Sequence, residues 1–308
     1  MAFIVVTGAS GMIGRAVVQA LNQRGDQVAR MVRRPAGLGE IFWDPARGII
    51  EPADLDGVHA VVHLAGENVG ARWTAARKQH IRDSRVQGTR LLSETLAGLR
   101  RRPQVLISAS AIGIYGNRGD EMLTEASLPG DPSRDFLVSV SQEWEAAAEP
   151  ARRSGIRVVH PRLGIVLSPA GGALQKMLPA FRAGVGGRMG SGSQWMSWIS
   201  LDDVVGAILH SLTTETVEGP VNATAPVPLT NRDFTRVLGR VLGRPTWFRV
   251  PGTVLRLALG EMAQGTVLSS ARVVPTELLK SGYRFQHSDL ESALRHVLAR
   301  ESGGNFPS

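Results

Sequence analysis

Three glycines near the N-terminus, Gly8, Gly11 and Gly14, have the spacing of a turn that can bind a phosphate group. An apolar, β-branched run, residues 3–6, precedes them and is typical of a strand buried on both faces of a parallel sheet. An apolar helix pattern follows them. In a strand, turn and helix of this kind, free backbone N–H groups and the positive end of the helix dipole face the phosphates. The sequence therefore predicts a dinucleotide site at this turn.

The three glycines have different predicted roles in that turn. Gly8 permits a tight turn, Gly11 lets the backbone approach a pyrophosphate, and Gly14 lets the helix pack close to the strand. Three further residues of the turn are expected to contact the cofactor: Ser10, Met12 and Ile13. The alternative, an ordinary glycine-rich turn, is less favoured because further segments of the chain match the same kind of site.

Two arginines, Arg33 and Arg34, follow the second expected strand, residues 27–32. In a nucleotide-binding fold this position meets the adenosine ribose. A carboxylate there would bind the 2′-hydroxyl of NAD, whereas an arginine accommodates the 2′-phosphate of NADP. Two arginines and no acid therefore favour NADP(H) as the cofactor. Two solvated arginines at the end of a strand are the alternative.

The third expected strand, residues 58–64, ends at Leu64, and Ala65 and Gly66 follow it. Small residues at this strand end leave room for the ribose and nicotinamide of the cofactor, and all three residues are expected to contact it. Glu67 follows directly, at the carboxyl edge of the sheet, where ligands bind in such folds. Its carboxylate is a candidate general base if burial raises its pKa.

Composition excludes several other classes of site. The 308 residues include no cysteine, so disulfides, thiol catalysis and thiolate metal sites are excluded. His59 and His63 lie four apart on an expected strand rather than a helix, so we expect no zinc pair and no other metal. No apolar run reaches membrane-spanning length, and the N-terminus enters a strand at once. We therefore expect a cytoplasmic protein with no membrane partner.

The formal charge of +8 at pH 7 does not by itself predict a nucleic-acid binder. The arginines are spread along the chain, and the triplet at residues 100–102 precedes Pro103, where a helix end favours cations. Nucleic-acid binders more often cluster their basic residues and interleave aromatic ones. We expect no nucleic-acid partner.

Several motifs along the chain carry a family resemblance. The chain resembles the extended short-chain dehydrogenase/reductase superfamily at residues 7–14, 63–66, 88–92 and 108–116. It is similar to an atypical branch, the nucleoside-diphosphate-sugar epimerase-like proteins, at residues 161–167, 190–194, 197–203 and 222–226. The tail, with residues 259–261 and 271–275, is similar to the C-terminal domain of unknown function that is typical of this branch.

The resemblance implies an α/β fold, a doubly wound parallel sheet (Rossmann) with a smaller, mostly helical C-terminal substrate lobe. We expect an NADP-binding domain at residues 1–168, with its sheet completed by segments between residues 196 and 225, and a substrate lobe and helical domain at residues 169–308. Arg85 takes the helix position where many members carry an asparagine that lines the site, so it is expected to touch the cofactor. Ser110 falls where the catalytic Ser or Thr of the superfamily polarises the substrate oxygen; a hydroxyl that caps the strand end is the alternative.

The sequence departs from the superfamily at its proton-transfer pair. The usual Tyr-x-x-x-Lys, in which a lysine and the cofactor lower the pKa of the tyrosine, is absent from the chain. Aligned on Trp144 and Glu145, the two positions fall at Leu137 and Ser141, and neither residue can do this chemistry. The candidate substitutes are Tyr115, in the loop after the Ser110 strand, and Glu67. Glu145 is expected on a solvated or paired helix face.

Two functions remain open at this point. The favoured one is an NADP(H)-dependent epimerase, dehydratase or reductase that acts on a sugar nucleotide or small carbonyl substrate without the usual pair. The alternative is a catalytically inactive NADP(H)-binding sensor or interaction protein. The expected partner is a small-molecule substrate, with a phosphate- or nucleotide-bearing compound as one candidate, and the expected assembly is a monomer or homodimer.

Overall fold

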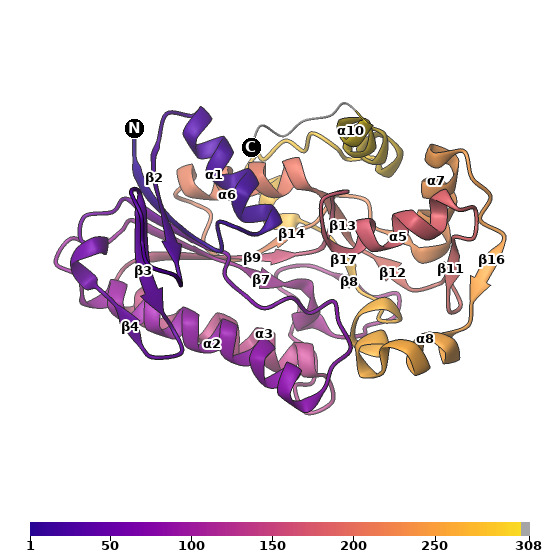
Figure 1. The fold of residues 1–308 in the computed structure, drawn as a ribbon, viewed down its shortest axis with the longest axis horizontal. Coiled ribbons are helices and arrows are strands. Elements are labelled where there is room, and N and C mark those ends of the chain that lie inside the picture. Colours follow the sequence, from indigo (N-terminus) through magenta and orange to yellow (C-terminus); the bar gives the residue numbers. More distant parts are fainter. Residues whose placement is uncertain (303–308) are drawn as a thin grey trace.

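A mostly parallel β-sheet runs through the protein (Figure 1). The computed structural model describes residues 1–302 and orders the sheet β14-β9-β6-β5-β1-β2-β3-β4, with β7 paired to β9. The strands are β1 (Phe3–Thr7), β2 (Gln27–Val32), β3 (Glu40–Asp44), β4 (Ile49–Ile50), β5 (Ala60–His63), β6 (Val105–Ser108), β7 (Ser110–Ala111), β9 (Arg157–Leu163) and β14 (Gly219–Ala223). The last residues of the expected second region, 303–308, lie outside the described residues.

Helices cover both faces of this sheet, because its strands are apolar on both sides (Figure 1). The helices are α1 (Met12–Gln23) and α6 (Leu201–Thr213) on one face, and α2 (Ala75–Gly98), α3 (Phe136–Ala146) and α4 (Glu149–Arg153) on the other. Two separate apolar clusters fill the spaces between sheet and helices. The expectation of a doubly wound α/β fold is confirmed.

The strand order reverses beside β1. The chain runs from β1 through β2 to β3 in one direction, then returns to β5 on the other side of β1 and continues through β6 and β9 to β14. Such a reversal opens a crevice at the carboxyl ends of the strands, where ligands bind in doubly wound folds. The segment that extends the sheet beyond β9 is β14, which lies within the expected range of residues 196–225.

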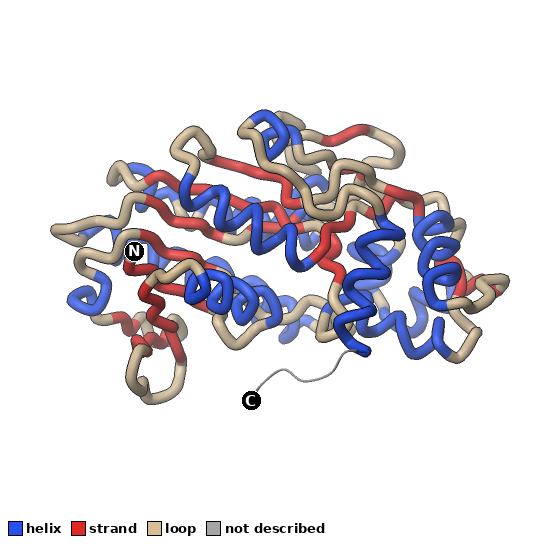
Figure 2. The backbone as a smooth tube through the Cα atoms, turned by 90° about the horizontal axis from the view of Figure 1, so that it is seen from above, coloured by secondary structure: helices blue, strands red, loops and turns tan. Residues whose placement is uncertain are grey.

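Beyond the sheet, the C-terminal half is mostly helical, and apart from the short helix at Thr276–Lys280, which packs beside β14, its helices gather at one end of the molecule (Figure 2). Its helices are α5 (Gly172–Arg182), α7 (Asn231–Leu242), α8 (Gly252–Leu259), α9 (Thr276–Lys280) and α10 (Leu290–Ser302), with one π-helical turn, Ala263–Val267. Short two-stranded sheets join them: β10 (Ile165–Leu167) with β13 (Trp198–Ser200), β11 (Gly187–Met189) with β16 (Phe248–Val250), β12 (Trp195–Met196) with β15 (Leu229–Thr230), and β17 (Arg272–Val273) with β8 (Met122–Leu123). The domain boundary at residue 168 stays a prediction.

The loop between β5 and α2, together with the start of α2, contacts the C-terminal half. The Trp73 side chain packs in an apolar cluster with Met262. Lys78 Nζ lies 2.9 Å from Glu261 Oε2, and Lys176 donates to the Gly70 carbonyl. These contacts bring the two halves together beside the carboxyl ends of the strands. Within residues 1–302, no helix has the combination of length and apolar character that crossing a membrane requires.

Candidate functional site

Three strand ends lie side by side at the point where the strand order reverses. Thr7 of β1 is in register with His63 of β5, and His63 is in register with Ser108 of β6. The three segments that follow these residues are the glycine turn, the stretch from Leu64 to Gly66, and the stretch that leads to Ser110. The structure thus brings the expected cofactor-binding segments and Ser110 to one edge of the sheet.

The glycine turn has the geometry that its sequence predicts. Gly8 has a φ of +65°, and a Cβ there would lie 2.7 Å from the carbonyl carbon of Leu64, so a side chain is excluded. A Cβ on Gly14 would overlap the Gly8 carbonyl, so this glycine sets how closely α1 packs on the turn. Gly11 precedes α1, and no side chain within residues 1–302 caps the helix there. Ser10 and Gly11 are exposed. The N-terminus of α1 is therefore open to an anion.

A buried histidine, His63, joins the turn to the neighbouring strand and helix. The Thr7 Oγ1 accepts the N–H groups of Leu64 and Ala65 and lies 2.7 Å from His63 Nδ1. The Thr7 proton is therefore donated to Nδ1, and His63 Nε2–H donates to Thr89 Oγ1 at 3.0 Å. Burial lowers the pKa of His63 to about 4, so the ring is neutral at pH 7. This network fixes the residues expected to face the nicotinamide.

The two arginines expected at the 2′-phosphate have different environments. Arg34 forms a bidentate pair with Glu40 of β3, with both N–O distances at 2.8 Å. Arg33 is exposed, and among residues 1–302 nothing forms a hydrogen bond or ion pair with it. Hydrogen bonds from Arg34 and from the Gly37 N–H hold the pKa of Glu40 below its usual value. Arg33 is thus the cation that remains available to a phosphate.

Arg85 of α2 lies beneath the loop after β5. Its Nη1 donates to the carbonyls of Glu67 and Ile81, and its guanidinium lies over the Trp144 ring, 4.9 Å from the ring centre. A Cβ on Gly66 would lie 3.2 Å from the guanidinium carbon. Burial lowers the pKa of Arg85 to about 10, which leaves it cationic at pH 7. The structure therefore places the positive charge of Arg85 in contact with Gly66.

Glu67 lacks the burial on which its expected role as a base depends. Its side chain is 38% exposed and pairs with Arg77, with Nη2 2.9 Å from Oε1. Its backbone N–H donates to Ser84 Oγ. An exposed, paired carboxylate is solvated in its charged form, so this environment does not favour proton abstraction by Glu67.

Ser110 is joined to a buried ion pair that sequence reasoning missed. Its Oγ donates a hydrogen bond to Glu145 Oε1 of α3 at 2.6 Å. Glu145 also accepts hydrogen bonds from Nε and Nη2 of Arg162, each at 2.9 Å. Burial by itself would raise the pKa of Glu145, but the hydrogen bond and charge of Arg162 outweigh it and hold that pKa below its usual value. Of the two environments expected for Glu145, solvated or paired, the structure shows the paired one, and it places this ionised carboxylate inside the protein.

Tyr115 lies behind this cluster and is fully buried. Its hydroxyl accepts from Arg162 Nη1 at 2.9 Å and can donate to Asn222 Oδ1 at 2.8 Å or to the Thr124 carbonyl. Burial raises the pKa of Tyr115, although the Arg162 charge opposes this. Every hydrogen-bonding position of the hydroxyl is thus used within the protein. A catalytic role for Tyr115 stays a prediction, and this environment does not favour it.

The side chains at the carboxyl edge of the sheet limit which proton transfers are possible there. Leu137, at the position of the superfamily tyrosine, packs against Gly113 and offers no proton. Ser110 donates its hydrogen bond to Glu145, so its oxygen has only acceptor capacity left, and the residue is only 1% exposed. The serine could therefore accept a hydrogen bond from a ligand hydroxyl, but it has no proton free for a carbonyl. The pairing of Glu145, in a helix, with Arg162, in a strand, has no pattern in the sequence that would indicate it.

Comparisons with known proteins agree with this geometry. The profile of the NAD dependent epimerase/dehydratase family matches residues 4–223, and a domain of unknown function, DUF1731, matches residues 250–297. An epimerase family protein of Mycobacterium tuberculosis is 42% identical over 301 residues, which cover 97% of this chain and 98% of the relative. The chloroplastic homologue of epimerase family protein SDR39U1 in Arabidopsis thaliana is 36% identical over 96% of this chain and 86% of its own length.

Solved structures support the same assignment. The crystal structure of human epimerase family protein SDR39U1 with NADPH matches with a TM-score of 0.88 at 33% identity, over 96% of this chain and 99% of that one. A UDP-N-acetylglucosamine 4-epimerase from Bacillus cereus matches with a TM-score of 0.75 at 15% identity, over 97% and 99% of the chains, which supports the fold alone. The expected resemblance and the expected class of cofactor, a nicotinamide dinucleotide, are both confirmed. The chain belongs to the NAD dependent epimerase/dehydratase family and carries a C-terminal DUF1731 domain.

Proposed function

We propose that this chain binds NADP(H) and acts on the carbon–oxygen bond of a sugar nucleotide or small carbonyl compound, as an epimerase, dehydratase or reductase. The observation that carries the proposal is the register of Thr7, His63 and Ser108. That register gathers the glycine turn, the stretch of residues 64–66 and Ser110 at one edge of the sheet. A dinucleotide held by the first two would lie beside the third.

The residues present fit an NADP(H) group. The open N-terminus of α1 suits the pyrophosphate, and Arg33, which has no partner among residues 1–302, suits the 2′-phosphate. The presence of NADPH in the human relative supports the same cofactor here. The residues proposed to hold it are Gly8, Ser10, Gly11, Met12, Ile13, Gly14, Arg33, Leu64, Ala65, Gly66 and Arg85. When bound, the nicotinamide would supply or accept a hydride.

Proton handling is proposed to rest on Ser110 and Glu145. Ser110 is 1% exposed, so the proposal requires that a bound substrate places a hydroxyl against Ser110 Oγ. That hydroxyl would pass its proton to Oγ, while the serine's own proton moves to Glu145 Oε1. Arg162 keeps Glu145 ionised and ready to accept, but it also makes the protonated form costly, at about 1.4 kcal/mol for each unit by which the pKa is lowered. A slow proton step is therefore expected compared with the Tyr-Lys chemistry of the superfamily.

The second candidate function, an NADP(H)-binding sensor or interaction protein, is favoured by one observation. Tyr115 is locked among Arg162, Asn222 and Thr124, and Glu67 is exposed and paired, so neither substitute acid/base group is arranged for proton transfer. A chain that retained its cofactor site and lost its chemistry would have these features.

Turnover assays with three variants separate the two functions. NADPH oxidation and NADP⁺ reduction are screened against sugar nucleotides and small carbonyls, and any substrate found is then tested with Ser110→Ala. We expect kcat to fall by about a hundredfold or more, within the range of a positioned acid/base group, with the Kd of NADPH unchanged. Tyr115→Phe and Glu67→Gln serve as matched controls and should keep most of the activity. Full activity of Ser110→Ala would contradict the proposed role, and tight NADPH binding without turnover in a broad screen would favour the sensor.

A further inference from the structure

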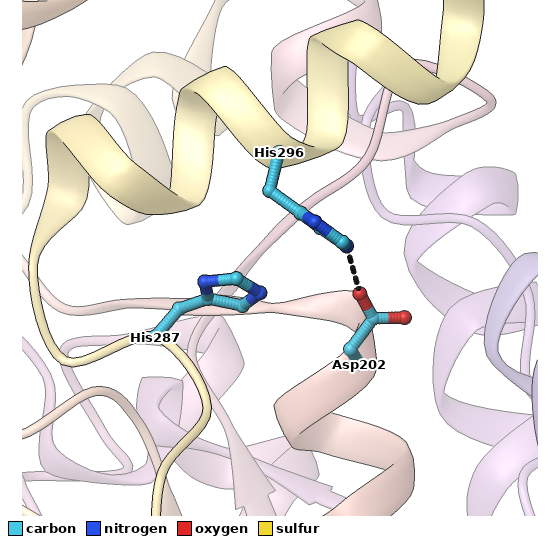
Figure 3. A group of neighbouring side chains, drawn as sticks. All are labelled: Asp202, His287 and His296. Carbon is cyan, nitrogen blue, oxygen red and sulfur yellow. Dashed lines mark hydrogen bonds and ion pairs between the residues drawn. The ribbon is translucent and has the colours of Figure 1, made fainter. Parts of the chain in front are cut away.

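Three side chains that the proposed function does not use converge between α6 and α10 (Figure 3). Asp202 lies in the first turn of α6, His287 in the loop before α10, and His296 on α10. The Nε2 of His296 lies 2.8 Å from Asp202 Oδ2, and one donor atom from each of the three residues lies within 4.8 Å of the other two. In Figure 3 both imidazole rings point toward the Asp202 carboxylate.

The protein holds these side chains in place through contacts outside the group. The neighbouring carboxylate, Asp203, is fully buried and accepts the backbone N–H groups of Gln286 and His287 at 2.7 and 3.0 Å. Those bonds fix the His287 loop to the first turn of α6. The helix that carries His296 is anchored separately, because Leu290 and Leu294 are buried in the apolar core of the C-terminal half. The three donors are therefore brought together by the fold rather than by their own attraction.

Two imidazole nitrogens and one carboxylate oxygen form a donor set that suits Zn²⁺. Bonds of about 2.0–2.2 Å to a tetrahedral ion place its ligand atoms about 3.2–3.6 Å apart. The separation of His296 Nε2 from Asp202 Oδ2 is 2.8 Å, and no two of the three ligand atoms are more than 4.8 Å apart, so the three lie near the spacing of ligands on one ion. We propose that Asp202, His287 and His296 bind a zinc ion that joins the C-terminal helix to α6.

Local charge supports a cation at this place. The N-terminus of α6 carries roughly half a positive charge from the helix dipole, and this charge repels a bound cation. Asp202 supplies a carboxylate in the group itself, and the carboxylate of Asp203 lies next to it in the first turn of α6. Mg²⁺ and Ca²⁺ prefer oxygen ligands and are disfavoured by two imidazoles. This site has no sequence pattern, because His287 and His296 are 85 and 94 residues from Asp202, and the expectation of no metal rested on His59 and His63.

Zinc titration of the full-length, chelator-treated protein tests the proposal. Competition with a chromophoric chelator at pH 7.5 should give one equivalent of bound Zn²⁺ with a Kd in the micromolar range or tighter, and saturating Zn²⁺ should raise the Tm. Separate His287→Ala and His296→Ala variants should each weaken binding by about tenfold or more, because each removes one of three ligands. His296 is exposed, so its replacement leaves the fold intact, which circular dichroism checks.

The matched control is His80→Ala, which removes an exposed histidine on α2 and should bind Zn²⁺ as the original chain does. Co²⁺ gives a second readout, because three protein ligands and a water should produce the intense visible absorption of a tetrahedral site. The proposal is overturned if no single saturable equivalent is found, or if His287→Ala and His296→Ala bind Zn²⁺ as tightly as His80→Ala. Equal responses to Mg²⁺ and Zn²⁺ would also overturn it.

Discussion

The glycine turn and the Ser110 cluster lie on the same edge of the sheet but are built in opposite ways. The turn is made of backbone from one continuous stretch, residues 7–14, and its selectivity for an anion comes from N–H groups and a helix dipole. The cluster is made of side chains from three elements, with Ser110, Glu145 and Arg162 contributed by β7, α3 and β9. The backbone site depends on its glycines, where an added side chain would fill the space of the backbone or the ligand, whereas the cluster depends on the identity of each of its three side chains.

The two regions also differ in how their charges are neutralised. Arg33 beside the turn has no partner within residues 1–302, so its charge is available to a ligand. In the cluster, Arg162 is neutralised by Glu145 and both are largely buried. The first arrangement is typical of a binding site, and the second is typical of a structural ion pair with one functional hydroxyl attached. The following experiments test this difference, beginning with the largest expected effect.

Replacing Arg162 with methionine should cost the most stability. The change leaves the Glu145 carboxylate buried without its partner, which typically destabilises a protein by about 3–5 kcal/mol. Urea unfolding of Arg162→Met measures the loss. Arg152→Met is the matched control, because it breaks an exposed pair with Glu149 and should leave the free energy of unfolding nearly unchanged. Adding Glu145→Gln to Arg162→Met should recover part of the loss. Equal stabilities for Arg162→Met and Arg152→Met would contradict a buried structural pair.

His63 should make the cofactor half sensitive to acid. Its pKa is lowered by burial from 6.5 to about 4, so the unfolded chain binds this proton at a higher pH than the folded one. Stability is therefore expected to fall by about 3 kcal/mol as the pH drops from 6.5 to 4, and the effect of this residue should level off below that. Urea unfolding across this range should show a shallower slope for His63→Gln. His80→Ala, the control, should keep the original slope, and an unchanged slope in His63→Gln would refute the prediction.

Gly11→Val should abolish cofactor binding while it preserves the fold. A Cβ there would meet little of the protein, with the Gly8 carbonyl oxygen at 3.2 Å, so the added side chain occupies the space expected for the pyrophosphate. We expect NADPH affinity to fall by about a hundredfold or more, equivalent to about 2.7 kcal/mol. Fluorescence titration measures it, with Gly98→Val as a control at a glycine whose Cβ would meet open space. Normal binding by a folded Gly11→Val chain would place the cofactor elsewhere.

The same contrast explains what the sequence could predict. The glycine turn and the doubly wound sheet were predictable because they depend on local patterns, a strand, a turn and a helix within consecutive residues. The bond from Ser110 to Glu145 was not, because the two residues are 35 positions apart and only the packing of α3 on the sheet brings them together. The pairing of Arg34 with Glu40, only six residues further along the chain, was also missed, because the types of the two residues do not show that their side chains turn toward each other. Burial of Glu67 was hypothesised from its place at a strand end, but its side chain turns outward to Arg77.

The central claim is that the backbone-built half of this edge binds NADP(H), with Arg33 as the residue that recognises the 2′-phosphate. The most direct measurement is the ratio of the Kd values for NADH and NADPH, determined by fluorescence titration in the original chain, in Arg33→Ala and in Arg34→Ala. We expect a ratio of about ten or more, equivalent to about 1.4 kcal/mol, that falls toward one in Arg33→Ala. Arg34→Ala should keep most of the ratio, because Glu40 already holds that arginine. Equal affinities for the two cofactors in the original chain, or an unchanged ratio in Arg33→Ala, would contradict it.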